Sequence, residues 1–206
     1  MRVRYYLHII SIFNPCNEQN QKMTKKTDMN NQALATLAGG CFWCIEGAFS
    51  QVQGIHSATS GYMGGDSDSP SYEEICSGNS GHAEVVQLMY DPEMISYQQI
   101  LEIFFTLHDP TQLNRQGNDI GSQYRSAVFY HNESQQNIVE QIIKEMRDAH
   151  MFDQEIVTQV CAEVTFYSGE DYHQDYFKNN PQNPYCQAVV SPKLAKFRKT
   201  FVDKLK

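Results

Sequence analysis

Residues 34–52 read LATLAGGCFWCIEGAFSQV, and the spacing of the apolar residues changes at the two glycines. Before the glycines, residues 34–38 form a short apolar run that predicts a strand. After them, apolar residues recur at helical spacing over residues 42–52, which predicts a helix. A strand that passes directly into a helix indicates a fold in which helices pack against a sheet.

The rest of the chain alternates between the same two patterns. Ser96 and Gln99 match a capping box, and Asn132 is a second helix-start signal. We predict further strands over residues 84–90, 124–130 and 156–166, and helices over 72–76, 97–108, 133–150, 171–178 and 192–205. Residues 54–71 and 109–121 are rich in glycine and polar residues and are predicted to be loops. Together these elements predict an α+β protein, a two-layer sandwich with helices against one sheet.

Length and charge exclude several classes of protein. The chain has 206 residues, which suits one domain, or one domain with a tail. Its formal charge of −8 argues against nucleic acid or an anionic membrane surface as the main partner, because both need a basic face. No apolar run approaches the roughly 18 residues of a membrane span. Six cysteines are too few for a disulfide scaffold, so the question is which thiol is reactive.

The first 33 residues differ from the rest in composition. They are basic on balance, and residues 14–32 are dominated by asparagine and glutamine. We therefore predict a polar, disordered extension over residues 1–33 and a single domain over residues 34–206. Residues 5–13 are apolar but are interrupted by polar residues and lack a cleavage site. We expect a cytoplasmic protein, or a periplasmic or secreted one if this segment acts as a signal.

Cys41 is the cysteine whose position suggests chemistry. It follows Gly39 and Gly40, which allow a tight turn, and it falls beside the first turn of the predicted helix. Free N–H groups at a helix start favour a thiolate. Phe42 and Trp43 add an apolar surface that could hold a small group, such as a methyl, over the sulfur.

Three other interpretations of Cys41 remain open from the residues alone. It could be a buried structural cysteine. Cys41 and Cys44 could be half of a zinc site, although no second C-x-x-C completes it. The pair could also be a thioredoxin-like redox motif, in which tryptophan usually precedes the first cysteine rather than following it. Of these, the redox pair is the main rival to a nucleophile in a methyl pocket.

Other residues could serve such a nucleophile. Glu84 shares the apolar face of its predicted strand, where loss of water would raise the carboxyl pKa and keep a proton available for donation. The alternative is a Glu paired with an Arg at a strand end. Tyr72 and Tyr124 supply phenols that donate hydrogen bonds without ionising, although tyrosines are also ordinary core residues. Asp119 could act at the site or cap a turn.

Six runs of the chain, in the same order along the sequence, resemble the peptide methionine sulfoxide reductase A family. These runs are residues 40–46 (GCFWCIE), 61–65 (GYMGG), 72–78 (YEEICSG), 81–86 (GHAEVV), 108–112 (HDPTQ) and 115–126 (RQGNDIGSQYRS). The likeness extends from about residue 34 to the C-terminus. It implies a ferredoxin-like two-layer α/β sandwich that uses no cofactor and no metal. It also implies reduction of the S-epimer of methionine sulfoxide, free or in oxidised proteins, with a thioredoxin-type reductant, as repair of oxidative damage. We expect a monomer.

The resemblance also assigns roles to residues. It makes Cys41 the nucleophile that becomes a sulfenic acid, and Glu84 the acid that protonates the sulfoxide oxygen. Around these two, the implied positions are Tyr72 and Tyr124 as the phenols that hold this oxygen, Phe42 and Trp43 as the methyl pocket, and Asp119 and His173 as further residues lining the site.

The sulfenic acid needs a second thiol, and the family pattern leaves its identity open. Many relatives have glycine at the position of Cys44, and some have a cysteine pair in a glycine-rich tail. We predict that Cys186 resolves the sulfenic acid, because it lies in an expected loop between proline-bounded segments and could swing toward Cys41. Cys44 is the alternative, although a bridge between residues three apart would loosen the first helical turn. The remaining cysteines are predicted to be bystanders: Cys16, Cys76 and Cys161.

Overall fold

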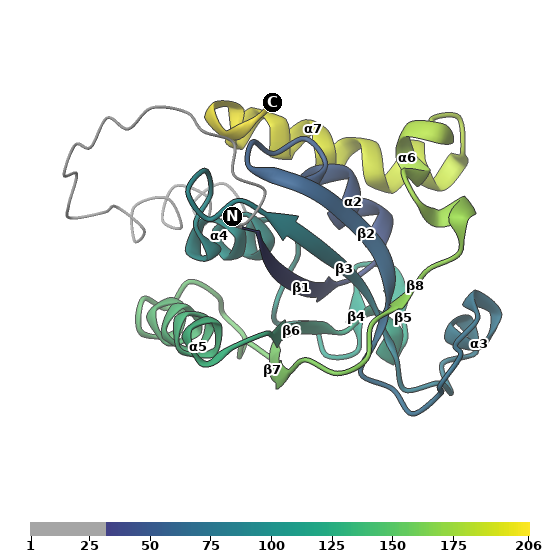
Figure 1. Cartoon of the computed structure of the whole chain (residues 1–206), viewed down its shortest axis with the longest axis horizontal. Coiled ribbons are helices and arrows are strands. Elements are labelled where there is room, and N and C mark those ends of the chain that lie inside the picture. Colours follow the sequence, from purple (N-terminus) through teal and green to yellow (C-terminus); the bar gives the residue numbers. More distant parts are fainter. Residues whose placement is uncertain (1–31) are drawn as a thin grey trace.

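A computed structural model describes residues 32–206 and shows one mixed sheet with helices packed against it (Figure 1). The sheet has the strand order β7-β6-β1-β3-β2-β8. Only β6 and β7 run parallel; the other neighbouring pairs are antiparallel. The strands are β1 (Ala33–Gly39), β2 (Ile55–Met63), β3 (Ala83–Tyr90), β6 (Ser126–Tyr130), β7 (Gln159–Ala162) and β8 (Tyr167–Ser168). The expected α+β combination of helices and a sheet is present, while the ferredoxin-like description remains a prediction.

The helices differ widely in length. The α-helices are α2 (Phe42–Phe49), α3 (Tyr72–Ser77), α4 (Tyr97–Leu107), α5 (Glu133–Asp148), α6 (Tyr176–Asn179) and α7 (Ser191–Thr200). Both predicted caps are present, since Ser96 and Gln99 form a reciprocal capping box on α4 and the Asn132 side chain accepts the Gln135 N–H on α5. A small hairpin, β4 (Arg115–Gln116) and β5 (Asp119–Ile120), lies inside the predicted loop over residues 109–121.

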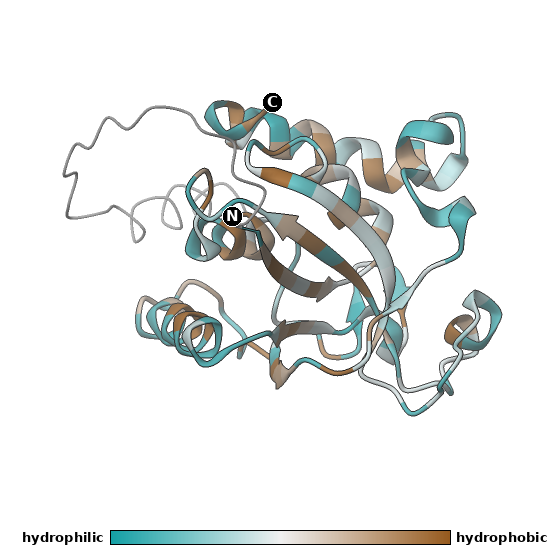
Figure 2. Cartoon of the chain, viewed as in Figure 1, coloured by the Kyte–Doolittle hydropathy of each residue, from teal (hydrophilic) through white to brown (hydrophobic). Residues whose placement is uncertain are grey.

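The core lies mainly on one face of the sheet. A large cluster of buried apolar side chains joins β1 and β3 to α2, α4, α5 and α7. Figure 2 shows brown, hydrophobic residues concentrated in the central strands, whereas α5 is teal over much of its surface. A smaller cluster on the other face includes Ala38, Val85 and Phe129, with Phe166 packed against it. Both faces of the central strands are therefore buried.

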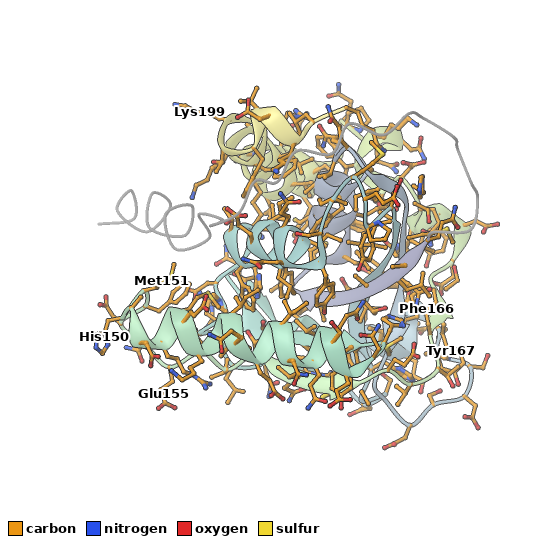
Figure 3. All side chains as sticks on the ribbon, turned by 60° about the vertical axis from the view of Figure 1, so that its left-hand side comes forward. His150, Met151, Glu155, Phe166, Tyr167 and Lys199 are labelled. Atoms are coloured by element: carbon orange, nitrogen blue, oxygen red, sulfur yellow. The ribbon has the colours of Figure 1, made fainter. Side chains whose placement is uncertain are left out.

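One loop prediction and one strand prediction are wrong. Residues 54–71 are not mostly loop, because 55–63 form β2, and eight residues of this strand pair in register with β3. Gly61 is required there, since a Cβ would stand 2.5 Å from the Phe166 ring. The predicted strand 156–166 forms β7 over only four residues, and the chain then crosses to β8 at the opposite sheet edge. In Figure 3, Phe166 and Tyr167 accordingly lie on the other side of the molecule from His150, beyond the end of α5.

Three helix predictions also need correction. The helix predicted over residues 42–52 ends at Phe49. The helix predicted over residues 171–178 breaks at Asp175, whose φ of 52° is left-handed and separates a 3₁₀ turn (Asp171–His173) from α6. The C-terminal helix begins earlier than residue 192, because a π-helical segment (Cys186–Val190) runs directly into α7. Cys186 is thus fully buried in helix rather than exposed in a mobile loop.

The predicted domain boundary is only partly described. Ala33 already belongs to β1, one residue before the expected start of the domain. The predicted disordered extension lies almost entirely outside the described residues, and so does the bystander Cys16. Within residues 32–206, no helix combines the length and the apolar character needed to cross a membrane.

Candidate active site

The site begins at the turn between β1 and α2. Gly40 has a φ of 91°, and a Cβ there would stand 2.7 Å from the Gln116 side chain. A Cβ on Gly39 would stand 2.9 Å from the Phe104 ring. One glycine therefore makes the turn and the other allows close packing. The turn leaves Cys41 as the N-cap residue of α2, outside the helical dihedrals and 6% exposed.

Glu84 on β3 reaches the start of the same helix. Its Oε2 accepts the Phe42 N–H over 3.0 Å, and the residue is 2% exposed. Burial raises the pKa of the Glu84 carboxyl to about 8, although the Phe42 N–H opposes this shift. Within residues 32–206, no Lys or Arg forms an ion pair with Glu84. The carboxyl is therefore largely neutral near pH 7 and available as a proton donor.

The Cys41 and Cys44 thiols form a hydrogen-bonded pair. Burial raises the pKa of Cys41, and the neighbouring Cys44 and Glu84 raise it further, while the Tyr185 hydroxyl lowers it. The hydrogen bond with Cys41 instead lowers the pKa of Cys44. The expectation that the helix start favours a Cys41 thiolate is therefore wrong for the resting protein, because burial outweighs the helix dipole at this sulfur.

Tyr185 and Asp119 form a contact over the thiol pair that the sequence analysis did not foresee. The Tyr185 hydroxyl donates to Oδ2 of Asp119 over 2.7 Å and also lies against the Cys41 thiol. Asp119 comes from the β4–β5 hairpin, so the hairpin and the segment before α7 meet over Cys41. The only sequence signal for Tyr185 was its position directly before Cys186.

Aromatic side chains pack together beside the thiols, where the methyl pocket was expected. The Trp43 ring stacks on Tyr176 at a centroid distance of 3.7 Å and an angle of 6°. The Trp43 Nε1–H donates to Nδ1 of His173 over 3.2 Å, and burial lowers the His173 pKa, which keeps this ring neutral. Phe42 lies 5.0 Å from His173, between ring centroids. Phe42, Trp43 and His173 therefore pack against one another, and Tyr176 is an additional member of this group.

The two predicted phenols, Tyr72 and Tyr124, lie close enough to Glu84 for its charge to affect their pKa. Tyr72 begins α3, and Tyr124 ends a 3₁₀ turn (Ser122–Tyr124). Burial raises the pKa of both phenols, and the Glu84 carboxylate raises it further. Both hydroxyls therefore stay protonated and able to donate.

A second carboxylate fixes the position of Tyr72. Oε1 of Glu170 accepts the Tyr72 N–H over 2.8 Å, and Oε2 accepts the Tyr62 hydroxyl over 2.7 Å. Neither Glu170 nor the fully buried Tyr62 was predicted from the sequence as a site residue. Nothing in their local sequence signals this role, since both act through contacts between distant segments.

The other described cysteines differ in their relation to the thiol pair. Burial raises the pKa of Cys186, and the charge of Cys44 raises it further, so these two thiols are electrostatic neighbours. Cys76 is exposed, and its thiol hydrogen-bonds with Tyr72. Cys161 packs on the smaller apolar cluster. All five described cysteines are free thiols, and no His, Cys, Asp or Glu cluster of residues 32–206 is arranged to hold a metal.

This combination defines a class of protein. A buried pair of thiols, a neutral carboxylic acid and a cluster of aromatic rings are the groups of a thiol-dependent oxidoreductase with a small apolar substrate group.

Comparison with known proteins identifies the family within this class. The family model for peptide methionine sulfoxide reductase matches residues 33–205. The peptide methionine sulfoxide reductase MsrA of Natronomonas pharaonis is 51% identical over 173 residues, which cover 84% of this chain and 97% of the relative. The MsrA of Chromobacterium violaceum is 52% identical over 167 residues, covering 81% and 95%.

Solved structures agree with the sequence relatives. The reduced form of Mxr1 from Saccharomyces cerevisiae has a TM-score of 0.69 at 35% identity, covering 78% of this chain and 92% of that one. Methionine sulfoxide reductase A of Corynebacterium diphtheriae has a TM-score of 0.67 at 31% identity, covering 74% and 77%. The chain belongs to the peptide methionine sulfoxide reductase MsrA family and is an oxidoreductase that reduces methionine sulfoxide.

Proposed function

We propose that this enzyme reduces the S-epimer of methionine sulfoxide, free and within oxidised proteins, through a sulfenic acid on Cys41. The observation that carries the proposal is the buried, largely neutral Glu84 carboxyl, which accepts the N–H of the residue next to Cys41. A sulfoxide whose methyl group lies against Phe42 and Trp43 would place its sulfur near Cys41. Its oxygen would then face Glu84 and the two phenols, which can donate to it.

In the first step the Cys41 sulfur gives two electrons to the sulfoxide sulfur. Cys44, whose pKa is lowered, accepts the Cys41 thiol proton when it is in its thiolate form, and the Cys41 sulfur then attacks the sulfoxide sulfur. Glu84 donates a proton to the sulfoxide oxygen, which makes that oxygen easier to remove from the substrate sulfur. The products are methionine and a Cys41 sulfenic acid, which carries the oxygen as a hydroxyl.

The second step forms a disulfide and releases water. We predicted Cys186 as the resolving thiol, but one contact and one feature of the backbone favour Cys44 for the first bridge. Cys44 already hydrogen-bonds with Cys41, and Cys41 lies at the N-cap, outside the helical dihedrals of α2. Cys186, beside Cys44, would then attack the Cys44 sulfur, free the Cys41 thiol and hold a Cys44–Cys186 disulfide. A thioredoxin-type dithiol would reduce that bridge, and we propose that repair takes place in the cytoplasm.

Epimer discrimination tests the reaction. With dithiothreitol as reductant, we expect the resolved S-sulfoxide of methionine to be reduced and the R-epimer to remain, measured as methionine formed. We expect the enzyme to leave insulin disulfides intact, which separates this reaction from general disulfide exchange. Equal use of both epimers, or continued reduction after alkylation of Cys41, would contradict the proposal.

Single cysteine variants test the order of the thiols. With thioredoxin as reductant, Cys44→Ser is expected to form about one methionine per enzyme and then stop. Cys186→Ser is expected to form the Cys41–Cys44 bridge in its first turnover but to be recycled more slowly, which thiol titration after one turnover would show. If Cys44→Ser turned over fully with thioredoxin while Cys186→Ser stopped after one turnover, Cys186 alone would be the thiol that resolves the Cys41 sulfenic acid.

A further inference from the structure

Glu46 is a buried carboxyl that the proposed reaction does not use. It lies on α2, one helical turn after Phe42, and is 3% exposed. Burial raises the pKa of Glu46 to about 7, although hydrogen bonds to the carboxylate oppose this shift. A buried charge of this kind costs stability unless it is well satisfied, so its hydrogen-bond partners indicate what it does.

The partners of Glu46 lie on a segment more than a hundred residues away. Its Oε1 accepts the Asp175 N–H over 2.8 Å, and the N–H of the next residue, Tyr176, also stabilises the carboxylate. Asp175 is the left-handed residue that precedes α6, and its own side chain does not cap that helix. Glu46 therefore supplies from α2 the cap that α6 lacks, and it holds the break between the His173 turn and α6 in place.

The segment that Glu46 holds forms one wall of the aromatic pocket. His173, two residues before the break, accepts the Trp43 N–H, and Tyr176, directly after it, stacks on the Trp43 ring. Trp43 and Glu46 lie on the same short helix. The carboxylate thus ties α2 to both groups that fix the orientation of the indole.

We propose that Glu46 is a positioning residue for the methyl pocket: by holding the backbone of Asp175 and Tyr176, its carboxylate keeps His173 and Tyr176 against Trp43. This inference rests on the proposed function only in naming the substrate methyl group as the occupant of the pocket. Glu46 touches neither Cys41 nor Glu84 in any hydrogen bond described, so its loss should affect substrate binding more than chemistry.

Glu46→Gln tests the proposal with two independent measurements. An amide keeps one acceptor oxygen but turns an NH2 group toward N–H donors, so it cannot hold both backbone groups. We expect KM for methionine sulfoxide to rise about tenfold with dithiothreitol, while kcat changes less than about threefold, because only binding is weakened. Trp43 is the only tryptophan in the chain, so its fluorescence reports directly on this pocket. We expect the emission maximum and intensity of the substrate-free variant to change.

Glu102→Gln is the matched control. Glu102 lies on α4, and burial likewise raises its pKa, but it has no described contact with the aromatic pocket. This variant should keep the wild-type KM and the wild-type Trp43 emission. A folded Glu46→Gln with unchanged KM and unchanged emission would overturn the proposal, as would a loss confined to kcat.

A second variant keeps the test decisive if Glu46→Gln does not fold. Tyr176→Leu removes the half-buried ring from Trp43 and leaves Glu46 in place. It should raise KM and change the emission without a comparable loss of kcat; an unchanged KM would show that this segment does not shape the pocket. If wild-type enzyme failed to reduce the sulfoxide at all, the proposed function would fall. The fluorescence comparison would still decide whether Glu46 orients Trp43.

Discussion

Two carboxyl groups of the site, Glu84 and Glu170, have pKa values shifted in opposite directions because their surroundings differ. Glu84 loses water and gains a single N–H donor, and its pKa rises to about 8. Glu170 is also partly desolvated, but the Tyr72 N–H and the Tyr62 hydroxyl both donate to it, and its pKa falls. Glu84 can therefore act as the proton donor of the proposed reaction, whereas Glu170 is the fixed anion that holds a phenol-bearing segment.

Replacing Glu84 tests this assignment through the pH profile. Glu84→Gln should lower kcat by about 10²-fold to 10⁴-fold and leave KM nearly unchanged, because general acid catalysis is lost while the pocket remains. In the wild-type enzyme the acid is lost as the pH rises through about 8, so the rate should fall above this pH. That descending limb should be absent from Glu84→Gln, measured as initial rates with dithiothreitol between pH 6 and 9.5.

Glu73→Gln is a suitable control for Glu84→Gln. Glu73 is an exposed carboxyl in the first turn of α3, next to Tyr72. Its replacement should leave both the rate and the pH profile as in the wild type. An unchanged rate in Glu84→Gln would refute its role as the acid.

At the scale of elements, the loop from β2 to α3 is held by the strand that carries Glu84. His82 lies next to β3; its Nδ1 accepts the Gly65 N–H over 3.2 Å, and its Nε2 lies 2.9 Å from the Ser67 carbonyl oxygen. A Cβ on Gly65 would stand 2.3 Å from the backbone nitrogen of His82 and 2.3 Å from the backbone oxygen of Ser80. This contact leaves no room for a side chain, and the loop leads directly to Tyr72.

Gly65→Ala should therefore displace the loop from β3. Backbone atoms would have to shift, and we expect a loss of roughly 1–3 kcal/mol in the free energy of unfolding, measured with urea. The rate of sulfoxide reduction should fall as well, since Tyr72 moves with the loop. Gly47→Ala on α2 is the control, because the nearest atom to its Cβ would be the end of the Leu194 side chain at 3.2 Å and no backbone atom would stand as close. Equal stability of the two variants would contradict the interpretation.

At the scale of the whole molecule, one buried histidine connects three separate segments. His108, at the end of α4, hydrogen-bonds with the Phe104 carbonyl and with Ser126 on β6, each over 2.8 Å. Ser126 in turn contacts Thr158, again over 2.8 Å. Burial lowers the His108 pKa to about 4, so this side chain is neutral in the folded protein near pH 7.

This low pKa makes stability depend on pH in a defined direction. The unfolded chain takes up the His108 proton near pH 6.5, whereas the folded protein does so only near pH 4. The contribution of His108 is therefore complete above pH 6.5 and is lost as the pH falls to 4. Since one pKa unit is worth about 1.4 kcal/mol, the loss amounts to roughly 3 kcal/mol.

His108→Gln isolates this contribution from that of the carboxyls. In urea unfolding, the stability difference between wild type and variant should be largest near pH 7 and should shrink steadily toward pH 4. Other titrating groups are common to both proteins and leave the difference unchanged. A difference that stays constant across this range would show that His108 is not the group responsible.

The sequence alone determined the features that depend on neighbours along the chain. The turn at Gly39 and Gly40, the helix after Cys41 and the two capped helices all follow from local spacing and hydrogen bonding. The burial of Glu84 followed from strand alternation, and the family resemblance assigned Tyr72, Tyr124 and His173 to the same site.

Only the tertiary structure decided what depends on contacts between distant segments. The pKa of Cys41 rises because other segments exclude water from its sulfur, and no local pattern records that burial. Cys186 is held in helix by the C-terminal packing, although its flanking prolines indicated a loop. Glu46, Glu170 and Tyr185 act across gaps of 66 to 129 residues. Local sequence cannot encode such pairings, because the free energy that selects them arises only when the whole core is assembled.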